Sequence, residues 1–281
     1  MDVAEVLREC WDLKVSGLEV LTGGMNSATW LAVCGADRVV LKAVDVDDAA
    51  FEPGLKLAVR LDDAGVITGR PRTSKRGRLV ERVDGRQVAV LEFVDGDELV
   101  PSDQAEIGDV LGRVHSAAPL EPCDTAAWLR FLLPFGESLD LEPWIRPAVE
   151  GAIADAVALG SVSWAWLHGD PAAEAFRRQA DGRVGLIDWG SAMRGPILYD
   201  VASAAMYVGR DVVPAYLRRR PDLTAEVDRG LEVFLRVRYA VQAGYFAWRI
   251  RTNLLTGISS PADNHKGLAD ARRSFGIRRD R

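Results

Sequence analysis

Two aspartates stand at the ends of apolar segments near the middle of the chain, a pattern that could serve one reaction. Asp170 ends the stretch WAWLHGD, and Asp188 ends VGLID 18 residues later. A carboxylate held at the end of a buried segment can accept a proton, and a second one can bind a metal ion. Either aspartate alone would more often be a turn or helix-capping residue. The spacing therefore makes the pair a candidate for base and metal ligand.

A lysine in the N-terminal part of the chain is a further candidate. Lys42 lies in the β-branched stretch VVLKAV, where its neighbours are of a buried type and an unpaired ammonium would be costly. It therefore needs an anionic partner. Glu52 opens the next helical stretch and is one candidate partner. The alternative is that Glu52 only stabilises the N-terminus of its own helix.

Adjacent glycines precede this strand. Gly23 and Gly24 lie between two predicted strands, with Ser27 at the start of the second strand. Glycines at such a turn would let backbone N–H groups approach a phosphate group. The alternative is an ordinary hairpin turn.

The elements that must position these residues change in type along the chain. Residues 17–44 predict three antiparallel strands, residues 51–64 a helix, and the Asp84-Gly85 pair a hairpin. Helices are predicted over 103–117, 125–133, 143–159 and 224–255. We therefore expect an α+β protein with a β-rich domain over residues 1–96 and a helical domain over residues 97–281.

The long helix over 224–255 carries a polar stripe on an otherwise apolar surface. Arg238, Gln242, Tyr245 and Arg249 follow one another at spacings of four, three and four, which places them on one face. They are candidate substrate contacts. The alternative is that they satisfy buried partners inside the fold.

Charge and composition limit the partners. The net charge is −6, although residues 231–281 hold ten Lys/Arg and four Asp/Glu. This balance argues against a general nucleic-acid binder. No apolar run is long enough to span a membrane, and the acidic start MDVAEVLREC is unlike a signal peptide, so we expect a cytoplasmic protein. Three scattered cysteines, without a C-x-x-C pair, indicate neither a disulfide framework nor a zinc site.

Taken in order, these features resemble a known family. A glycine turn, a strand lysine, a helix glutamate, LEFVDG, H-G-D, I-D-W and GPILYDVASA follow one another, as in the aminoglycoside phosphotransferase and choline kinase-like family, relatives of the protein kinases. The resemblance runs from about residue 15 to 275. It implies a bilobal protein-kinase-like fold, with a small antiparallel β-rich N-lobe and a larger helical C-lobe.

The resemblance also implies roles for single residues. Lys42 would hold the phosphates of ATP and pair with Glu52, with Gly23, Gly24 and Ser27 nearby in the nucleotide site. Asp170 would accept the proton of the substrate hydroxyl, and Asp188 would bind Mg²⁺. The backbone of Glu92, Phe93 and Val94 would contact the adenine. His168 would orient the catalytic loop, and Asp200 would tie its helix to that loop. The polar stripe of the long helix would line the acceptor pocket.

One position departs from the family pattern H-G-D-x-x-x-x-N. The Asn that would ligate a metal ion and brace the catalytic Asp is replaced by Ala175, whose methyl group cannot coordinate Mg²⁺. Glu174 is adjacent and has a suitable carboxylate. A one-metal enzyme, an impaired enzyme and an engineered change all remain open.

These features predict an ATP- and Mg²⁺-dependent phosphotransferase that acts on a hydroxyl group. Two arginines in the stripe would repel polycationic aminoglycosides, so we expect a neutral or anionic acceptor, either a small molecule or a peptide. Antibiotic biosynthesis and antibiotic resistance are the settings that the family suggests. The alternative is a kinase-fold binding module with little catalysis that serves as partner to another enzyme.

Overall fold

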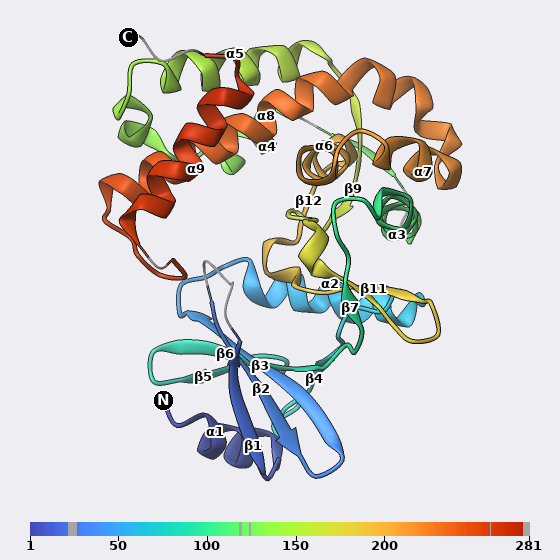
Figure 1. Cartoon of the computed structure of the whole chain (residues 1–281), viewed down its shortest axis with the longest axis vertical. Coiled ribbons are helices and arrows are strands. Elements are labelled where there is room, and N and C mark those ends of the chain that lie inside the picture. The colour runs from blue at the N-terminus through green and yellow to red at the C-terminus, as the bar shows by residue number, and fades with distance from the viewer. Residues whose placement is uncertain (22–26, 118–119, 124, 259, 278–281) are drawn as a thin grey trace. The chain divides into compact units, whose positions relative to one another are not determined.

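The computed structural model describes residues 1–21, 27–117, 120–123, 125–258 and 260–277. The chain divides into two compact units (Figure 1). The first holds Met1–Val100 and Ala173–Met193, and the second holds Pro101–Ala172 and Arg194–Arg281. Residues 173–193 were expected in the helical domain over residues 97–281. They pack with the first unit because the strands they form pair with a strand of that unit.

The first unit is built mainly from short strands, with two helices. Its elements are α1 (Val3–Trp11), β1 (Gly17–Leu21), β2 (Ala28–Cys34), β3 (Asp37–Asp45), α2 (Phe51–Asp63), β4 (Pro71–Arg72), β5 (Glu81–Val83), β6 (Arg86–Glu92), β7 (Asp97–Glu98), β10 (Phe176–Arg178) and β11 (Val184–Leu186).

An antiparallel sheet forms the centre of this unit. Within the described ranges its strand order is β1-β2-β3-β6-β4, with β5 also paired to β6. The predicted hairpin at Asp84-Gly85 joins β5 to β6, and both residues have positive φ, 48° and 72°, as a two-residue hairpin turn requires. Lys42 lies in the central strand β3, opposite Thr29 of β2 and Ala89 of β6.

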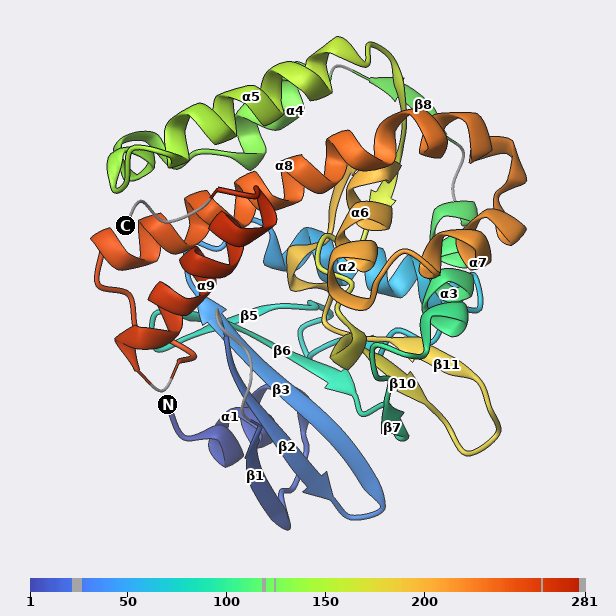
Figure 2. The same ribbon diagram turned by 45° about the horizontal axis from the view of Figure 1, so that its top comes forward.

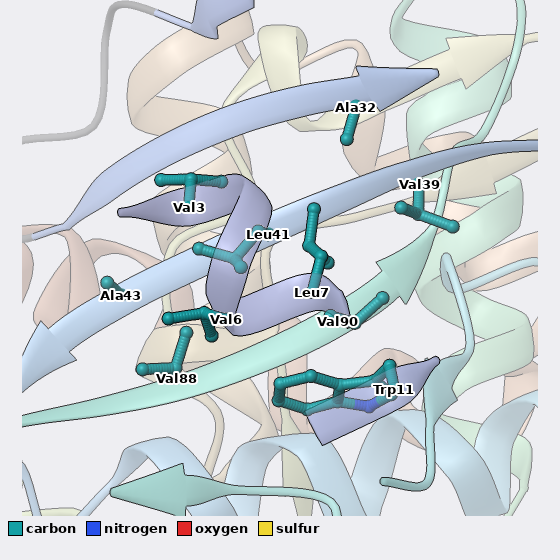
Figure 3. Packing of buried hydrophobic residues seen from close by; sticks show 10 residues of the cluster. All are labelled: Val3, Val6, Leu7, Trp11, Ala32, Val39, Leu41, Ala43, Val88 and Val90. Atoms are coloured by element: carbon teal, nitrogen blue, oxygen red, sulfur yellow. The ribbon is translucent and has the colours of Figure 1, made fainter. Parts of the chain in front are cut away.

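Each face of the sheet is covered by one helix. On one face, α1 packs Val6, Leu7 and Trp11 against side chains that include Leu41 and Val90 (Figure 3). The other face carries a second core cluster, in which Phe51 and Leu55 of α2 pack with Ala89 and Leu91. Because side chains alternate along a strand, Lys42 lies on the α2 face.

The second unit is mainly helical. Its elements are α3 (Gln104–Ser116), β8 (Glu121–Cys123), α4 (Thr125–Leu132), α5 (Ile145–Ala158), β9 (Val162–Leu167), β12 (Met193–Pro196), α6 (Ile197–Val208), α7 (Val212–Arg219), α8 (Thr224–Arg251) and α9 (Pro261–Ser274).

The long helix α8 is the centre of this unit. It packs against α5, α6 and α9, and Figure 2 shows α5 running alongside it. Gly230 permits the contact with α6, because a Cβ there would lie 2.4 Å from Leu198 Cδ1. The helix ends at Arg251, earlier than the predicted residue 255, because Asn253 adopts φ 51° and a left-handed residue stops a helix.

The structure confirms the predicted fold class: one β-rich unit and one larger helical unit. None of the helices that the structure describes is long and apolar enough to cross a membrane.

Candidate functional site

The loop that carries Asp170 follows β9 directly and is held by a buried acid of α6. The backbone N–H groups of His168 and Gly169 donate to the carboxylate of Asp200 at 2.7 and 2.8 Å. Asp200 is fully buried. Hydrogen bonds to an ionised acceptor are the stronger kind, so this carboxylate fixes the start of the loop, as the sequence predicted for Asp200.

Behind Asp200 lies a buried network that the sequence analysis did not identify. His115 of α3 places Nε2 3.3 Å from Asp200 Oδ2, and its Nδ1 lies 2.9 Å from the hydroxyl of Tyr216 in α7. Because a carboxylate only accepts, Nε2 is the donor to Asp200, and in the neutral ring Nδ1 then accepts from the Tyr216 hydroxyl. Burial raises the pKa of that hydroxyl. The residues of each hydrogen-bonded pair lie 85 or more positions apart in the sequence and belong to different helices. No local sequence pattern therefore predicts the network.

The carboxylate of Asp170 is held by two donors from the helices beside it. Tyr207 of α6 donates its hydroxyl to Asp170 Oδ1 at 2.6 Å. Arg238 of α8 donates Nη2 to the same oxygen at 2.6 Å and to the Tyr207 hydroxyl at 2.7 Å. The Asp170 side chain is 47% exposed, while that of Arg238 is 10% exposed. A buried cation and a phenol thus fix one oxygen of a half-exposed carboxylate.

The charge states of these partners follow from their surroundings. Burial by itself lowers the pKa of Arg238, but Tyr199, Tyr207 and Asp170 more than offset this, so the net direction is upward. Desolvation of the hydroxyl raises the pKa of Tyr207, and Asp170 raises it further against the opposing effect of Arg238. Arg238 is therefore a permanent cation, and Tyr207 a neutral donor.

The polar stripe of α8 does not act as one surface. Arg249 is fully buried, and its guanidinium donates to Asn264 Oδ1 at 2.9 Å, to Thr256 O at 2.6 Å and to the Tyr245 hydroxyl at 2.9 Å. This arginine holds α8 to the segment that leads into α9, so its donors are used inside the fold and we do not assign it to substrate. Gln242 and Tyr245 are partly exposed and remain candidates.

In the first unit, Lys42 and Asp188 form an ion pair. Lys42 is 14% exposed and Asp188 is 53% exposed. Asp188 has φ 67° and ψ 62°, a left-handed conformation that is uncommon for a residue other than glycine. The next residue anchors the turn, because the buried Trp189 indole donates Nε1 to Leu186 O at 2.9 Å.

Two glycines lie close to the Lys42–Asp188 pair or to the turn that carries Asp188. Gly54 of α2 allows the helix to meet the turn, because a Cβ there would lie 2.1 Å from Trp189 O. A Cβ at Gly190 would lie 3.5 Å from Asp188 Oδ1 and 3.7 Å from Lys42 Nζ. Gly190 therefore borders both charged groups, and a Cβ there would make ordinary van der Waals contact with each of them.

The expected pair of Lys42 with Glu52 is not formed in this structure. Lys42 pairs with Asp188 instead, and Glu52 pairs with Lys56 one helical turn later at 2.7 Å. An i,i+4 lysine is the nearest cation that a helix offers to a glutamate.

The other predicted nucleotide contacts lie in the same unit. Gly23 and Gly24 fall outside the described residues. Ser27 Oγ lies 3.4 Å from Thr29 Oγ1. At the end of β6, the N–H groups of Glu92 and Phe93 donate to Arg70 O and Arg38 O.

The third residue of that segment differs from the other two. The amide of Val94 makes no hydrogen bond to any part of the chain that the structure describes. Val94 itself is buried, with 8% of its surface exposed.

The carboxylate of Asp188 could bind a divalent cation, but only as one protein ligand. Over the described residues, no group of three or more His, Cys, Asp or Glu side chains could hold a metal ion. Mg²⁺ is usually bound through one or two carboxylates together with substrate phosphates, so one exposed carboxylate is compatible with that ion. Ala175 is buried and Glu174 is exposed.

Comparisons with known proteins give the same assignment of fold. A model of the phosphotransferase enzyme family matches residues 18–232. No curated protein matches the sequence significantly. Similar solved structures include a microcompartment-associated aminopropanol kinase, with 18% identity and a TM-score of 0.76 over 96% of this chain and 94% of that one.

Two further solved structures are similar in fold. An amicoumacin kinase, solved in complex with AMP-PNP and Ca²⁺, has 15% identity and a TM-score of 0.72 over 98% of this chain and 93% of that one. A choline kinase from Streptococcus pneumoniae has 17% identity and a TM-score of 0.67 over 95% and 98%.

Proposed function

Because this chain belongs to the phosphotransferase enzyme family, we propose that it is a kinase that transfers the γ-phosphate of ATP to a hydroxyl group of a small molecule. The observation that carries the proposal is the state of Asp170. Its carboxylate is half exposed, and the loop before it is fixed through backbone amides to the buried Asp200. A general base needs this combination of access and fixed position.

We assign nucleotide binding to residues of the first unit. Lys42 is the phosphate-binding cation, and the Val94 amide is the donor to the adenine. Asp188 is the protein ligand of Mg²⁺, which supplies neutralisation of the phosphate charge when it is bound with the nucleotide. The exposure of Asp188, 53%, supports this assignment, because the carboxylate beside Lys42 is accessible to a cation.

We assign deprotonation of the acceptor to Asp170. Its carboxylate accepts the proton of the acceptor hydroxyl while the acceptor oxygen bonds to the γ-phosphorus and the bond from that phosphorus to the bridging oxygen breaks. ADP and the phosphorylated acceptor are the products. The half-exposed side chain allows the acceptor to reach the carboxylate.

The acceptor is neutral or anionic in this proposal. Arg238 is a permanent cation 2.6 Å from the Asp170 carboxylate, so the pair leaves no net negative charge there to attract a polycationic acceptor. Gln242 and Tyr245 are the proposed contacts to the acceptor on α8. Kinases named for aminopropanol, amicoumacin and choline share this fold, so the acceptor class has to be established on this chain.

ADP formation from ATP and Mg²⁺ over a panel of neutral, anionic and cationic alcohols tests the proposal. We expect turnover with neutral or anionic alcohols, a loss of about 100-fold or more in Asp170→Asn, and little change in the matched control Asp155→Asn, which alters an exposed carboxylate of the same unit. Turnover that survives in Asp170→Asn, or preferred turnover of polycationic aminoglycosides, would contradict the assignment.

One observation favours a second function. Ala175 stands where the family pattern has its metal-binding Asn, and a chain without that ligand could bind nucleotide without transferring phosphate. Calorimetry would distinguish the two functions: binding of ATP and Mg²⁺ without turnover over the whole panel would favour the binding module.

A further inference from the structure

Arg238 is kept in an environment that is costly for a cation. Its side chain is 10% exposed, with Cζ 5.7 Å from the ring centre of Tyr199 and 5.5 Å from that of Tyr207. Its Nε is buried and has no hydrogen-bond partner among the residues the structure describes. Buried ion pairs often contribute no more to stability than apolar residues of similar size. Packing alone therefore does not account for an arginine here.

The contacts of Arg238 and Tyr207 converge on a single atom. Both donate to Asp170 Oδ1 at 2.6 Å, and Arg238 also donates to the Tyr207 hydroxyl at 2.7 Å. The three side chains thus form a closed triangle of hydrogen bonds. Within the described part of the chain, no group donates to Asp170 Oδ2. The two carboxylate oxygens of Asp170 are therefore inequivalent, one bound and one free.

We propose that Arg238 and Tyr207 are positioning residues for the reaction: they hold Asp170 by Oδ1 and leave Oδ2 to take the proton of the acceptor hydroxyl. The inference rests on the proposed kinase function. The family pattern has an Asn that braces the catalytic Asp, and the methyl side chain of Ala175 cannot do so. Arg238 and Tyr207 would brace Asp170 instead. The brace comes from α6 and α8 of the same unit in place of the loop itself.

This role differs in its consequences from two simpler ones. An arginine that bound the acceptor directly would mainly affect KM. Replacing a purely structural arginine would mainly lower the free energy of unfolding. We expect no large loss of stability in Arg238→Met, because the half-exposed Asp170 stays solvated when its partner is removed. A positioning residue acts through Asp170, so it should affect kcat and only while Asp170 is present.

A double-mutant cycle with Asp170→Asn tests this directly. Arg238→Met and Tyr207→Phe would each be measured in the native chain and in Asp170→Asn, with ADP formation as the readout and the best alcohol of the panel, or water, as acceptor. In the native chain we expect kcat to fall about 10- to 100-fold for Arg238→Met and less for Tyr207→Phe, with KM for ATP unchanged. In Asp170→Asn, where the residual rate no longer uses the base, both changes should have effects below about threefold.

Three variants serve as controls. Arg236→Met and Tyr239→Phe change neighbouring residues of α8 for which the structure gives no contact with Asp170, and both should keep native kcat. Arg238→Lys keeps a cation with N–H donors but lacks the planar guanidinium, so it should recover part of the kcat lost in Arg238→Met. Thermal unfolding of each variant identifies any that fail to fold.

The outcomes separate this inference from the function on which it rests. Equal losses in the two backgrounds, a loss confined to KM, or native kcat in Arg238→Met would overturn the positioning role and leave the kinase intact. If the native chain shows no turnover, or if its turnover is unchanged in Asp170→Asn, the proposed function is overturned and the inference with it.

Discussion

Lys42 and Asp188 form an ion pair whose members differ in exposure, 14% for the lysine and 53% for the aspartate. An ion pair with a half-exposed member is screened by water, and such pairs contribute about 0 to 1 kcal/mol to stability. The pair is therefore a weak support for the fold. In the proposed kinase, Lys42 would bind a phosphate group and Asp188 its cation, so each would exchange a weak interaction for a stronger one.

The first prediction separates these two effects. Replacing Lys42 by Met should weaken binding of ATP and Mg²⁺ about 10-fold or more, because a charge-assisted contact to phosphate contributes about 1.5 to 3 kcal/mol, while the free energy of unfolding changes by less than about 1 kcal/mol. Calorimetry and urea denaturation measure the two quantities. Lys56→Met, an exposed lysine paired with Glu52, is the control and should bind nucleotide as the native chain does. Native affinity in Lys42→Met would remove Lys42 from the site.

The need for a partner could be predicted at Lys42, but its identity could not. Sequence reasoning identified a strand lysine that required an anion, and the structure supplies Asp188 in place of Glu52. The i,i+4 position of Lys56 was a signal that Glu52 already had a partner. Along α8, Arg238 and Arg249 were expected on one shared face, but 11 residues of helix separate them by about 16 Å. Their surroundings therefore differ, and spacing alone could not assign them.

At the scale of elements, α2 fixes the turn that carries Asp188. Gly54 allows this contact, since a Cβ there would meet Trp189 O at 2.1 Å, which is far below van der Waals contact. The second prediction is that Gly54→Ala lowers stability and weakens ATP binding, although alanine is favoured over glycine in a helix by about 1 kcal/mol.

The matched control for Gly54→Ala is Gly151→Ala in α5. Its nearest neighbour outside its own helix would be Arg236 Nη2 at 3.9 Å, so the same substitution should raise the free energy of unfolding, by up to about 1 kcal/mol. Urea denaturation of both variants and nucleotide calorimetry check the comparison. If the two substitutions shift stability in the same direction, the contact between α2 and the Asp188 turn does not limit this position.

The helix α6 fixes the start of the loop that carries Asp170, through Asp200. The third prediction concerns Asp200→Asn. An amide offers one acceptor oxygen where the carboxylate accepts from the N–H groups of both His168 and Gly169, so a buried donor is left without its partner. We expect a loss of about 1 to 3 kcal/mol in the free energy of unfolding, measured by urea denaturation. Asp228→Asn, an exposed aspartate of α8, should change it by less than about 0.5 kcal/mol. Equal changes in the free energy of unfolding would mean that the buried carboxylate of Asp200 contributes no more to stability than an exposed one.

The elements themselves were largely predictable, because their signals are local. The helices expected over 51–64, 103–117, 125–133 and 143–159 are confirmed to within two residues at each end. The return of residues 173–193 to the first unit was missed, because it depends on the pairing of β10 with β7, strands about 80 residues apart. Likewise, Tyr207 showed no sign of its contact with Asp170, which depends on how α6 packs beside the loop.

At the scale of the whole molecule, the two units differ in the titratable groups that they bury. All five tyrosines of the chain lie in the second unit. Burial raises the pKa of Tyr199, Tyr207, Tyr216 and Tyr239 above the usual value of about 10. The first unit contains no tyrosine. Tyrosine ionisation is therefore a signal that reports on one unit alone.

The last prediction follows from the sign of these shifts. A tyrosine whose folded pKa is raised holds its proton at a pH where the unfolded chain has lost it, so its contribution to stability is complete below about pH 10 and declines as the pH rises further. We expect tyrosinate absorbance of the native chain to lag behind that of the urea-unfolded chain above about pH 10, and then to rise together with loss of the circular dichroism signal. Tyr216→Phe removes one such group and should make the decline in stability with pH less steep. Tyrosines that all titrated reversibly near pH 10 in a chain that kept its dichroism would show that water reaches the hydroxyls of Tyr207 and Tyr216, and the network behind Asp170 and Asp200 would then be open to solvent.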